Sequence, residues 1–306
     1  MTATDATPVA ERTPGRGRLV LRRFLRRGSA LTGLVVVVLL YAMAFSYPLF
    51  SPWDHAVPDY LAFLAPPGGS HWFGTTKIGE DVFAQVMRGM QKSLTIGLLV
   101  GLLSTSLAAV VGAAAGYFGG WVDRVLMWLV DLLLVLPSFL VVAVASPAFR
   151  GESWLVFVLL LAGFSWMITA RIVRGMTLTL REREYVKAAR FMGQGPFRVI
   201  AKHILPNMAS LLIIDATLTV GAAVLAETGL SFFGFGVRPP DVSLGTLIAS
   251  GTESAMTYPW LFYFPAGFLV VFVLAVNLVG DGLRDALDPA AAGRERAKKA
   301  EKGERA

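Results

Sequence analysis

Six apolar stretches determine what this chain can fold into. A helix rises about 1.5 Å per residue, so roughly 20 apolar residues cross a hydrocarbon core about 30 Å thick. Lipid offers no hydrogen bonds to an open backbone, so such stretches predict an all-α integral membrane protein with six transmembrane helices. The expected spans are Leu31–Phe50, Leu94–Phe118, Val122–Ser146, Trp154–Thr169, Met208–Leu230 and Trp260–Val279.

The composition supports the same class. Charged residues make up 16% of the 306 residues, whereas soluble proteins average about 25%. There is no cysteine, which excludes disulfides and thiolate metal sites, and the three histidines lie too far apart in the sequence to suggest a metal site. The net charge of +7 would suggest nucleic acid in a soluble protein. In a membrane protein it indicates sidedness, and we expect no nucleic-acid partner.

The positive charges gather in three pieces of the chain: residues 1–30, 171–207 and the C-terminal tail. Six spans with a cytoplasmic N-terminus place all three pieces, and the short 119–121 turn, on the cytoplasmic side, as the positive-inside rule requires. Both termini are then cytoplasmic. The predicted organisation is a basic tail (1–30), a first span (31–50), an extracytoplasmic loop (51–92), a core of five spans (93–285) and a second basic tail (286–306).

The first span has an alternative interpretation as a signal peptide. Ala42, Met43 and Ala44 resemble a small-x-small cleavage site behind an apolar run. The apolar run continues past that site to Phe50, which favours an uncleaved membrane anchor.

The basic segment 171–207 has the sequence pattern of two short helices outside the bilayer core. Gly193 is typical of a helix C-terminus, and Pro196 is typical of the first position of a second helix. One apolar face is expected on each helix. These faces comprise Tyr185, Ala188, Ala189 and Met192 on the first helix, and Phe197, Ile200, Ala201 and Ile204 on the second. The residues alone leave two interpretations open: a docking surface for a soluble partner, or an amphipathic hairpin on anionic lipid.

The spacing of Ala188-Ala189, Gly193 and Leu205-Pro206 resembles the EAA loop of ABC importer permeases. The sequence departs from that pattern at Lys187, where the family's leading glutamate falls, and at His203, where its isoleucine falls. The form EYVKAAR…HILPN is similar to that of the peptide-permease branch. Further resemblances to this branch are HWFGTTKIGEDV (71–82), GYFGGWVDR (116–124), LAETGLSFFGFGVRPP (225–240) and GDGLRDALDP (280–289).

Together these motifs resemble the C-type permease subunit of dipeptide, oligopeptide and nickel importers, most closely an actinobacterial oligopeptide version. The resemblance implies the type I ABC importer fold in a bacterial cytoplasmic membrane, with 171–207 as a cytoplasmic helix–turn–helix coupling loop. Oligopeptides are the implied substrate; dipeptides and nickel chelates are the alternatives within the branch. The residues implied to couple to the ATPase are Glu184, Lys187, Ala188, Ala189, Gly193, Leu205 and Pro206.

The resemblance also implies partners. These are a homologous B-type permease, ABC ATPase subunits as two chains or one fused chain, an extracytoplasmic peptide-binding lipoprotein, and membrane lipid. The sequence contains no G-x-x-x-x-G-K-[ST] phosphate loop, no G-x-S-x-G elbow and no metal-ligand cluster. We therefore expect no catalytic site and no cofactor on this chain, with ATP and Mg²⁺ bound by the ATPase subunits.

Three carboxylates fall within the expected spans: Asp131, Asp215 and Glu227. A carboxylate at bilayer depth costs roughly 2.5–3.5 kcal/mol, so it must face protein or water. Each could line a peptide path or pair within the protein, and Glu227 is the stronger path candidate. Phe232 is a candidate for an apolar constriction of the path, or an interfacial anchor.

Two other functions compete with an importer subunit. A stand-alone secondary transporter would predict inverted repeats with paired broken helices, but the basic loop occurs once. A membrane receptor or scaffold would use the basic loop to bind lipid.

Overall fold

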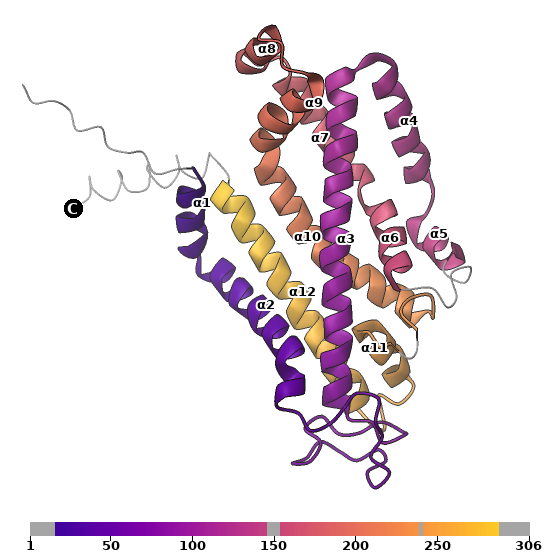
Figure 1. The fold of residues 1–306 in the computed structure, drawn as a ribbon. Helices are drawn as coiled ribbons and strands as arrows, with labels where there is room; N and C mark the ends of the chain where they lie inside the picture. Colours follow the sequence, from indigo (N-terminus) through magenta and orange to yellow (C-terminus); the bar gives the residue numbers. More distant parts are fainter. Residues whose placement is uncertain (1–15, 146–153, 239–240, 288–306) are drawn as a thin grey trace, which may run out of the picture.

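The computed structural model describes residues 16–145, 154–238 and 241–287, which form a bundle of long helices (Figure 1). Of the two predicted basic tails, the structure describes residues 16–30 and 286–287, and residues 147–153, between the third and fourth expected spans, lie outside the described residues. The helices are α1 (Arg16–Leu25), α2 (Gly28–Ser46), α3 (Val82–Phe118), α4 (Gly120–Val135), α5 (Ser138–Ala145), α6 (Trp154–Ser165), α7 (Met167–Leu180), α8 (Glu184–Phe191), α9 (Pro196–Val199), α10 (Ala209–Phe232), α11 (Leu244–Thr252) and α12 (Trp260–Leu287). A short 3₁₀ turn, Tyr47–Leu49, follows α2, and a π turn (Ile200–Ile204) and a 3₁₀ turn (Leu205–Met208) join α9 to α10.

The expected six spans are matched by four continuous helical stretches and two bent pairs. The continuous stretches are Gly28–Leu49, Val82–Phe118, Pro196–Phe232 and Trp260–Leu287. The pair α4 and α5 bends by 79°, and the pair α6 and α7 by 47°. At the first bend Leu136 is extended, the conformation that the following Pro137 favours, because its ring disfavours helical geometry in the preceding residue.

Two helices extend beyond the apolar stretches that predicted them. Helix α3 begins at Val82 instead of Leu94. At this start, the Asp81 carboxylate accepts a hydrogen bond from the Ala84 amide at 2.7 Å. This is a standard N-cap that no hydropathy pattern reports. Helix α7 continues to Leu180, so the start of the basic segment 171–207 belongs to the bundle.

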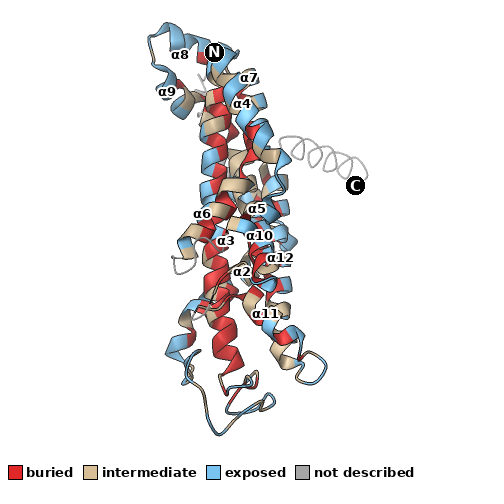
Figure 2. Cartoon of the chain, turned by 90° about the vertical axis from the view of Figure 1, so that its right-hand side faces the viewer, coloured by how far each residue is buried: buried red, intermediate tan, exposed pale blue. Residues whose placement is uncertain are grey.

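Helix α3 is the centre of the bundle, and Figure 2 shows buried residues along much of its length. Two pairs of glycines, each with three residues between them, allow close approach to its neighbours. A Cβ on Gly97 or Gly101 would lie within 3.0 Å of α10, and one on Gly112 or Gly116 would lie within 2.7 Å of α7. The glycines of this helix therefore allow close packing of helix backbones.

The two ends of the bundle differ in structure (Figure 1). Helices α8 and α9 project from one end, and residues 51–81 form a folded loop at the other. If the bundle spans a membrane, the hairpin and the loop lie on opposite sides of it.

Candidate functional site

The α8–α9 hairpin turns where the sequence predicted. Helix α8 ends before Gly193, which has a φ of +78°, the left-handed conformation that favours glycine. The Gly193 amide donates to the Arg190 carbonyl oxygen at 3.0 Å, and Pro196 occupies the first turn of α9. The predicted helix–turn–helix is confirmed in its turn and its two helices.

A buried cluster fixes the hairpin to the bundle. Val186 and Ala189 of α8 pack with Val199, Ile204 and Met208 on the return towards α10. The same cluster includes Ala113 of α3 and Val173 of α7, so the hairpin is continuous with the bundle core. Both short helices are therefore held in a defined position.

The opposite side of the hairpin is apolar and exposed. Phe191 is 91% exposed, Phe197 79% and Met192 73%. Ala188 is also exposed, whereas Ala189 is 1% exposed. The expectation that Ala188 and Ala189 share one open surface is therefore wrong: Ala189 faces the bundle, and only Ala188 remains at the surface.

Three contacts brace the hairpin against the end of α3. The Arg181 guanidinium donates to the Gly116 carbonyl oxygen at 2.8 Å. The Arg190 guanidinium lies 5.8 Å from the centre of the Tyr117 ring, and the Phe197 ring lies edge-on to Phe118. A force on the hairpin would therefore reach the central helix directly.

Lys187, where the sequence departs from the family pattern, pairs with a neighbouring carboxylate. Its Nζ lies 3.0 Å from a Glu182 carboxylate oxygen, and Arg181 lies on the other side at 3.4 Å. The hydrogen bond and charge of Lys187, followed by the charge of Arg181, hold the pKa of Glu182 below its ordinary value. The pair is exposed, so it orients the Lys187 side chain without adding much stability.

The remaining predicted coupling residues occupy different environments. Glu184 is exposed in the first turn of α8, where a negative charge suits the helix dipole. Leu205 packs against the buried cluster beneath the hairpin. Pro206 is exposed beside a groove between α10 and α12. The outward surface thus contains Glu184, Lys187, Ala188 and Gly193, while Ala189 and Leu205 support it from below.

Two of the intramembrane carboxylates pair with other helices. Asp131 of α4 accepts a hydrogen bond from Arg171 of α7. Asp215 of α10 accepts one from Thr105 of α3 and one from Thr169 of α7, each at 2.6 Å. These contacts agree with the alternative in which polar side chains pair between helices and hold them together.

Glu227 lies inside the chain. Its side chain is 0% exposed and accepts hydrogen bonds from Ser93 at 2.9 Å and from Ser231 at 2.6 Å. Glu227 is therefore enclosed by the chain itself, and its place on the path stays a prediction. Phe232 is partly exposed at the end of α10 and contacts Phe233 edge-on. The four path candidates do not converge, since Asp215 and Glu227 alone lie about 18 Å apart along α10 at helical rise.

A charged cluster near the start of α3 was missed from the sequence. Lys92 places its Nζ 2.8 Å from an Asp241 carboxylate oxygen and 4.5 Å from the centre of the Trp154 ring. Arg88 approaches the same carboxylate at 3.5 Å. The partners lie far apart in the chain, so no local pattern could have revealed them. The cluster joins α3 to α6 and to the segment before α11.

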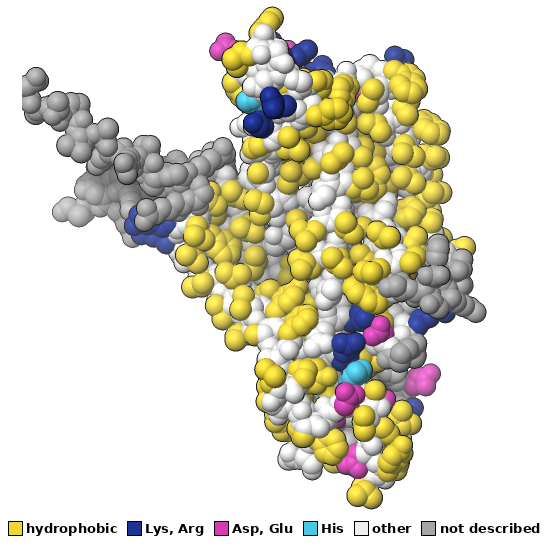
Figure 3. Space-filling view, viewed as in Figure 1, with side chains coloured by type: hydrophobic (Ala, Val, Ile, Leu, Met, Phe, Trp, Pro, Cys, Tyr) yellow, Lys and Arg dark blue, Asp and Glu magenta, His cyan; other side chains and the backbone are white. Residues whose placement is uncertain are grey.

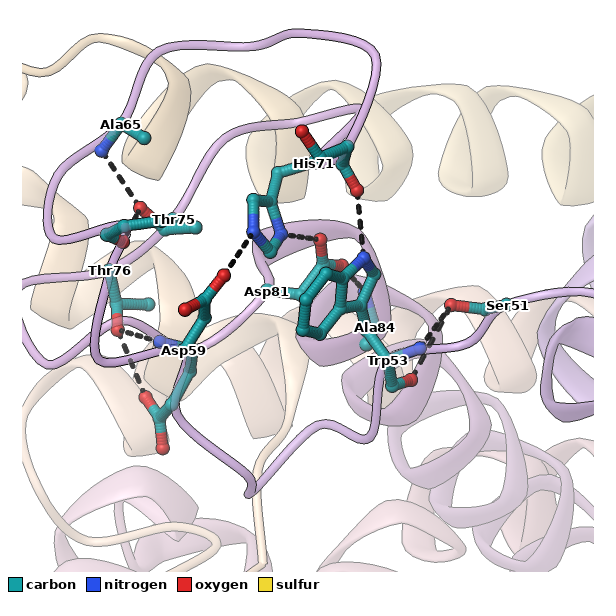
Figure 4. Close-up of polar contacts among 12 residues, drawn as sticks. Ser51, Trp53, Asp59, Ala65, His71, Thr75, Thr76, Asp81 and Ala84 are labelled. Atoms are coloured by element: carbon teal, nitrogen blue, oxygen red, sulfur yellow. Dashed lines mark hydrogen bonds and ion pairs between the residues drawn. The ribbon is translucent and has the colours of Figure 1, made fainter.

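The loop 51–81 is closed around a buried histidine (Figure 4). The His71 ring lies between Asp81 at 2.8 Å and Asp59 at 3.3 Å, with the Trp53 ring 4.4 Å away. The backbone amide of Leu61, followed by His71, lowers the pKa of Asp59. Hydropathy indicates a loop here but not this arrangement, which gives the end of the bundle opposite the hairpin a defined surface.

Comparison with protein families agrees with this architecture. Residues 108–293 match the binding-protein-dependent transport system inner membrane component. Residues 15–67 match the N-terminal transmembrane domain of oligopeptide transport permease C. The first match contains the whole hairpin and α10 to α12, and the second contains α1 and α2.

Individual relatives are similar over nearly their whole length. The chain is 57% identical to the oligopeptide transport system permease protein OppC of Mycobacterium tuberculosis, over 90% of this chain and 95% of the relative. It is 35% identical to the protein of the same name from Bacillus subtilis, over 94% of each chain. It is 40% identical to a putative peptide permease protein of Brucella suis, over 88% of this chain and 89% of the relative.

Proposed function

Because this chain belongs to the family of binding-protein-dependent transport system inner membrane components, we propose that it is a permease subunit of an ATP-driven oligopeptide importer. The named relatives in Mycobacterium and Bacillus support oligopeptides as the substrate. ATP hydrolysis is assigned to partner ATPase subunits. This chain supplies half of the membrane path and a contact through which the ATPase moves it.

The observation that carries the proposal is the exposed apolar side of the α8–α9 hairpin. Phe191 and Phe197 project from a hairpin whose other side is buried in the bundle. Exposed aromatic residues on a rigid support are typical of the anchors that dominate protein–protein binding. A lipid-surface hairpin would instead be held mainly by its own burial in the bilayer.

The braces below the hairpin support a mechanical role. Arg181 and Arg190 connect it to the end of α3, which packs closely on α7 and α10 through its glycines. A displacement of the hairpin by an ATPase would therefore move the packed core, because interdigitated helices do not deform independently. In this account the end that carries the hairpin is cytoplasmic, and the loop 51–81 faces the binding protein.

The exposed polar groups of the bundle fit a second permease subunit. The ion pair of Asp131 and Arg171 is more than half exposed on each side chain. Charged side chains at membrane depth face protein or water, not lipid. We assign this side of α4 and α7 to the homologous B-type subunit or to the path between the two.

Co-purification tests the docking role. The double variant Phe191→Ser and Phe197→Ser should remain inserted and lose at least tenfold in ATPase retention, since each aromatic anchor contributes on the order of 2 kcal/mol. Met256→Ser is the matched control, because Met256 is 96% exposed near α11, away from the hairpin. Unchanged ATPase retention in the double variant would refute docking at this surface. If the unaltered chain retains neither an ATPase nor a homologous permease, the importer proposal itself fails.

A further inference from the structure

An apolar groove opens between helices at the end of the bundle that carries the hairpin. Its volume is about 520 Å³, within the range of roughly 300–1,000 Å³ typical of ligand pockets. Helices α1, α2, α10 and α12 all contribute to its wall. The residues used below are Val20, Leu21, Phe24, Asn207, Ser210 and Ile213.

Helix α1 covers one side of the groove and is strongly two-sided. Val20, Leu21 and Phe24 line the groove. At about 100° per residue, Arg22 falls on the far side of the helix, Arg23 lies at the edge of the apolar side next to Val20, and Arg26 follows directly after the helix end. Apolar residues on one side and arginines on the other are typical of a helix lying at a membrane interface.

The positive charge beside the groove is not neutralised within the described part of the chain. Arg27 pairs with Asp285 of α12. Arg22, Arg23 and Arg26 have no carboxylate partner among the described residues, and Arg22 and Arg26 are exposed. In Figure 3 dark blue side chains gather beside α1, next to an otherwise largely yellow surface.

Close packing holds α1 in place over the groove. Phe24 and Ala30 are buried against Ala286 of α12. A Cβ on Gly282 would lie 2.2 Å from the Ala30 Cβ, so α12 and the start of α2 are in direct contact. The groove and its arginines therefore form one fixed arrangement.

The wall of the groove also contains polar groups from the start of α10. The Ser210 hydroxyl has no hydrogen-bond partner among the described residues. The Asn207 amide group donates to the His203 carbonyl oxygen at 2.7 Å, which leaves its own oxygen available. A ligand with one polar end and a long apolar part matches this wall.

We propose that the groove binds one anionic phospholipid of the cytoplasmic leaflet. An acyl chain occupies the apolar groove, and the phosphate lies on the Arg22, Arg23 and Arg26 side chains. Basic pockets between transmembrane helices on the cytoplasmic side suit anionic head groups. The proposal needs only that α2 and α12 span the membrane with α1 at the cytoplasmic surface. It does not depend on the transported substrate.

Native mass spectrometry of the complete transporter tests this site with phosphatidylglycerol and phosphatidylcholine as probes. We expect selective retention of one phosphatidylglycerol at this chain. Changing Arg22, Arg23 and Arg26 together to Gln should weaken binding by on the order of 100-fold, since each arginine near the surface contributes about fivefold. Arg124→Gln is the matched control, because Arg124 is exposed at the start of α4 and, among the described residues, bonds only a carbonyl of its own helix.

A second variant separates a defined site from general attraction to negative lipid. Ile213→Trp fills the groove and leaves every arginine in place. It should abolish retention of the lipid while the transporter still assembles. Equal retention of both lipids, or undiminished retention in either variant, would overturn the proposal. A cross-link from the groove to the partner permease, with no lipid bound, would overturn it as well.

Discussion

The packing of α3 on α7 predicts that changing glycine to alanine destabilises the protein at Gly112 and does not destabilise it at Gly175. In Gly112→Ala the new Cβ would lie 2.4 Å from the Ala170 carbonyl oxygen and 2.7 Å from the Val173 Cβ. Ordinary contacts lie beyond about 3.4 Å, so the two helices must separate by about 1 Å. In Gly175→Ala, on α7, the new Cβ meets nothing within 4 Å.

Two opposing contributions set the expected change in the free energy of unfolding. Overpacking typically costs 1–3 kcal/mol, and replacing glycine by alanine inside a helix gains roughly 0.5–1 kcal/mol. We therefore expect Gly112→Ala to lower the free energy of unfolding by about 1–2 kcal/mol, a fall in Tm of roughly 2–6 °C. We expect Gly175→Ala to be neutral or slightly stabilising.

Thermal unfolding of the detergent-solubilised protein measures both variants under one condition. Equal Tm values for the two variants, or a higher Tm for Gly112→Ala than for the unaltered protein, would refute the packing argument. Uptake activity is a second readout, because separation of α3 from α7 should also weaken transmission from the hairpin.

Three further predictions follow from individual contacts. The side chains of Asp123 and Arg174 pair at 2.5 and 2.6 Å. Exchanging the two residues should restore much of the stability that either single reversal loses, with a coupling free energy of about 1–3 kcal/mol in a double-mutant cycle. Additive losses of stability in the cycle would contradict a direct pair. The pKa of Asp59 is lowered from its ordinary value of 3.8. The ionised Asp59 carboxylate therefore stabilises the fold fully above about pH 3.8, and this stabilisation is lost as the pH falls through the folded-state pKa. Loop 51–81 should thus resist an acid-active protease fully near pH 5 and lose resistance only in stronger acid. The loss of resistance should be smaller in Asp59→Asn. An equal loss in the variant and the unaltered protein would contradict a role for the Asp59 carboxylate. Glu227→Leu should destabilise the chain by about 2–4 kcal/mol, since it leaves two buried hydroxyls without their partner, whereas Glu227→Gln retains hydrogen bonding and should cost clearly less in denaturant titration.

The spans and the hairpin turn could be predicted because their signals are local. Apolar length located the six spans, and Gly193 with Pro196 located the turn, since each residue type restricts its own backbone. The side of α8 that faces the bundle was predicted less well. Val186 and Ala189 are buried while Tyr185 and Met192 are exposed, because a helix with apolar residues on several sides can pack in more than one rotation.

The polar partners could not be predicted because they depend on the tertiary arrangement. The sequence places Arg171 and Arg174 in a basic loop, whereas they lie in α7 and pair with aspartates of α4. The sequence marks Glu227 as a candidate for the path or for pairing within the protein, but it does not reveal that Ser93 of α3 is a hydrogen-bond partner. A carboxylate in an apolar span signals that a partner exists, without identifying the partner.

We propose that a partner ATPase drives oligopeptide import through this chain by acting on the α8–α9 hairpin. The most direct measurement is accumulation of a labelled oligopeptide in proteoliposomes that contain the whole transporter, with the binding protein on the side of loop 51–81 and ATP on the side of the hairpin. We predict accumulation with this orientation and its loss in the Phe191→Ser and Phe197→Ser variant. Accumulation without ATP, or unchanged accumulation in that variant, would contradict the account.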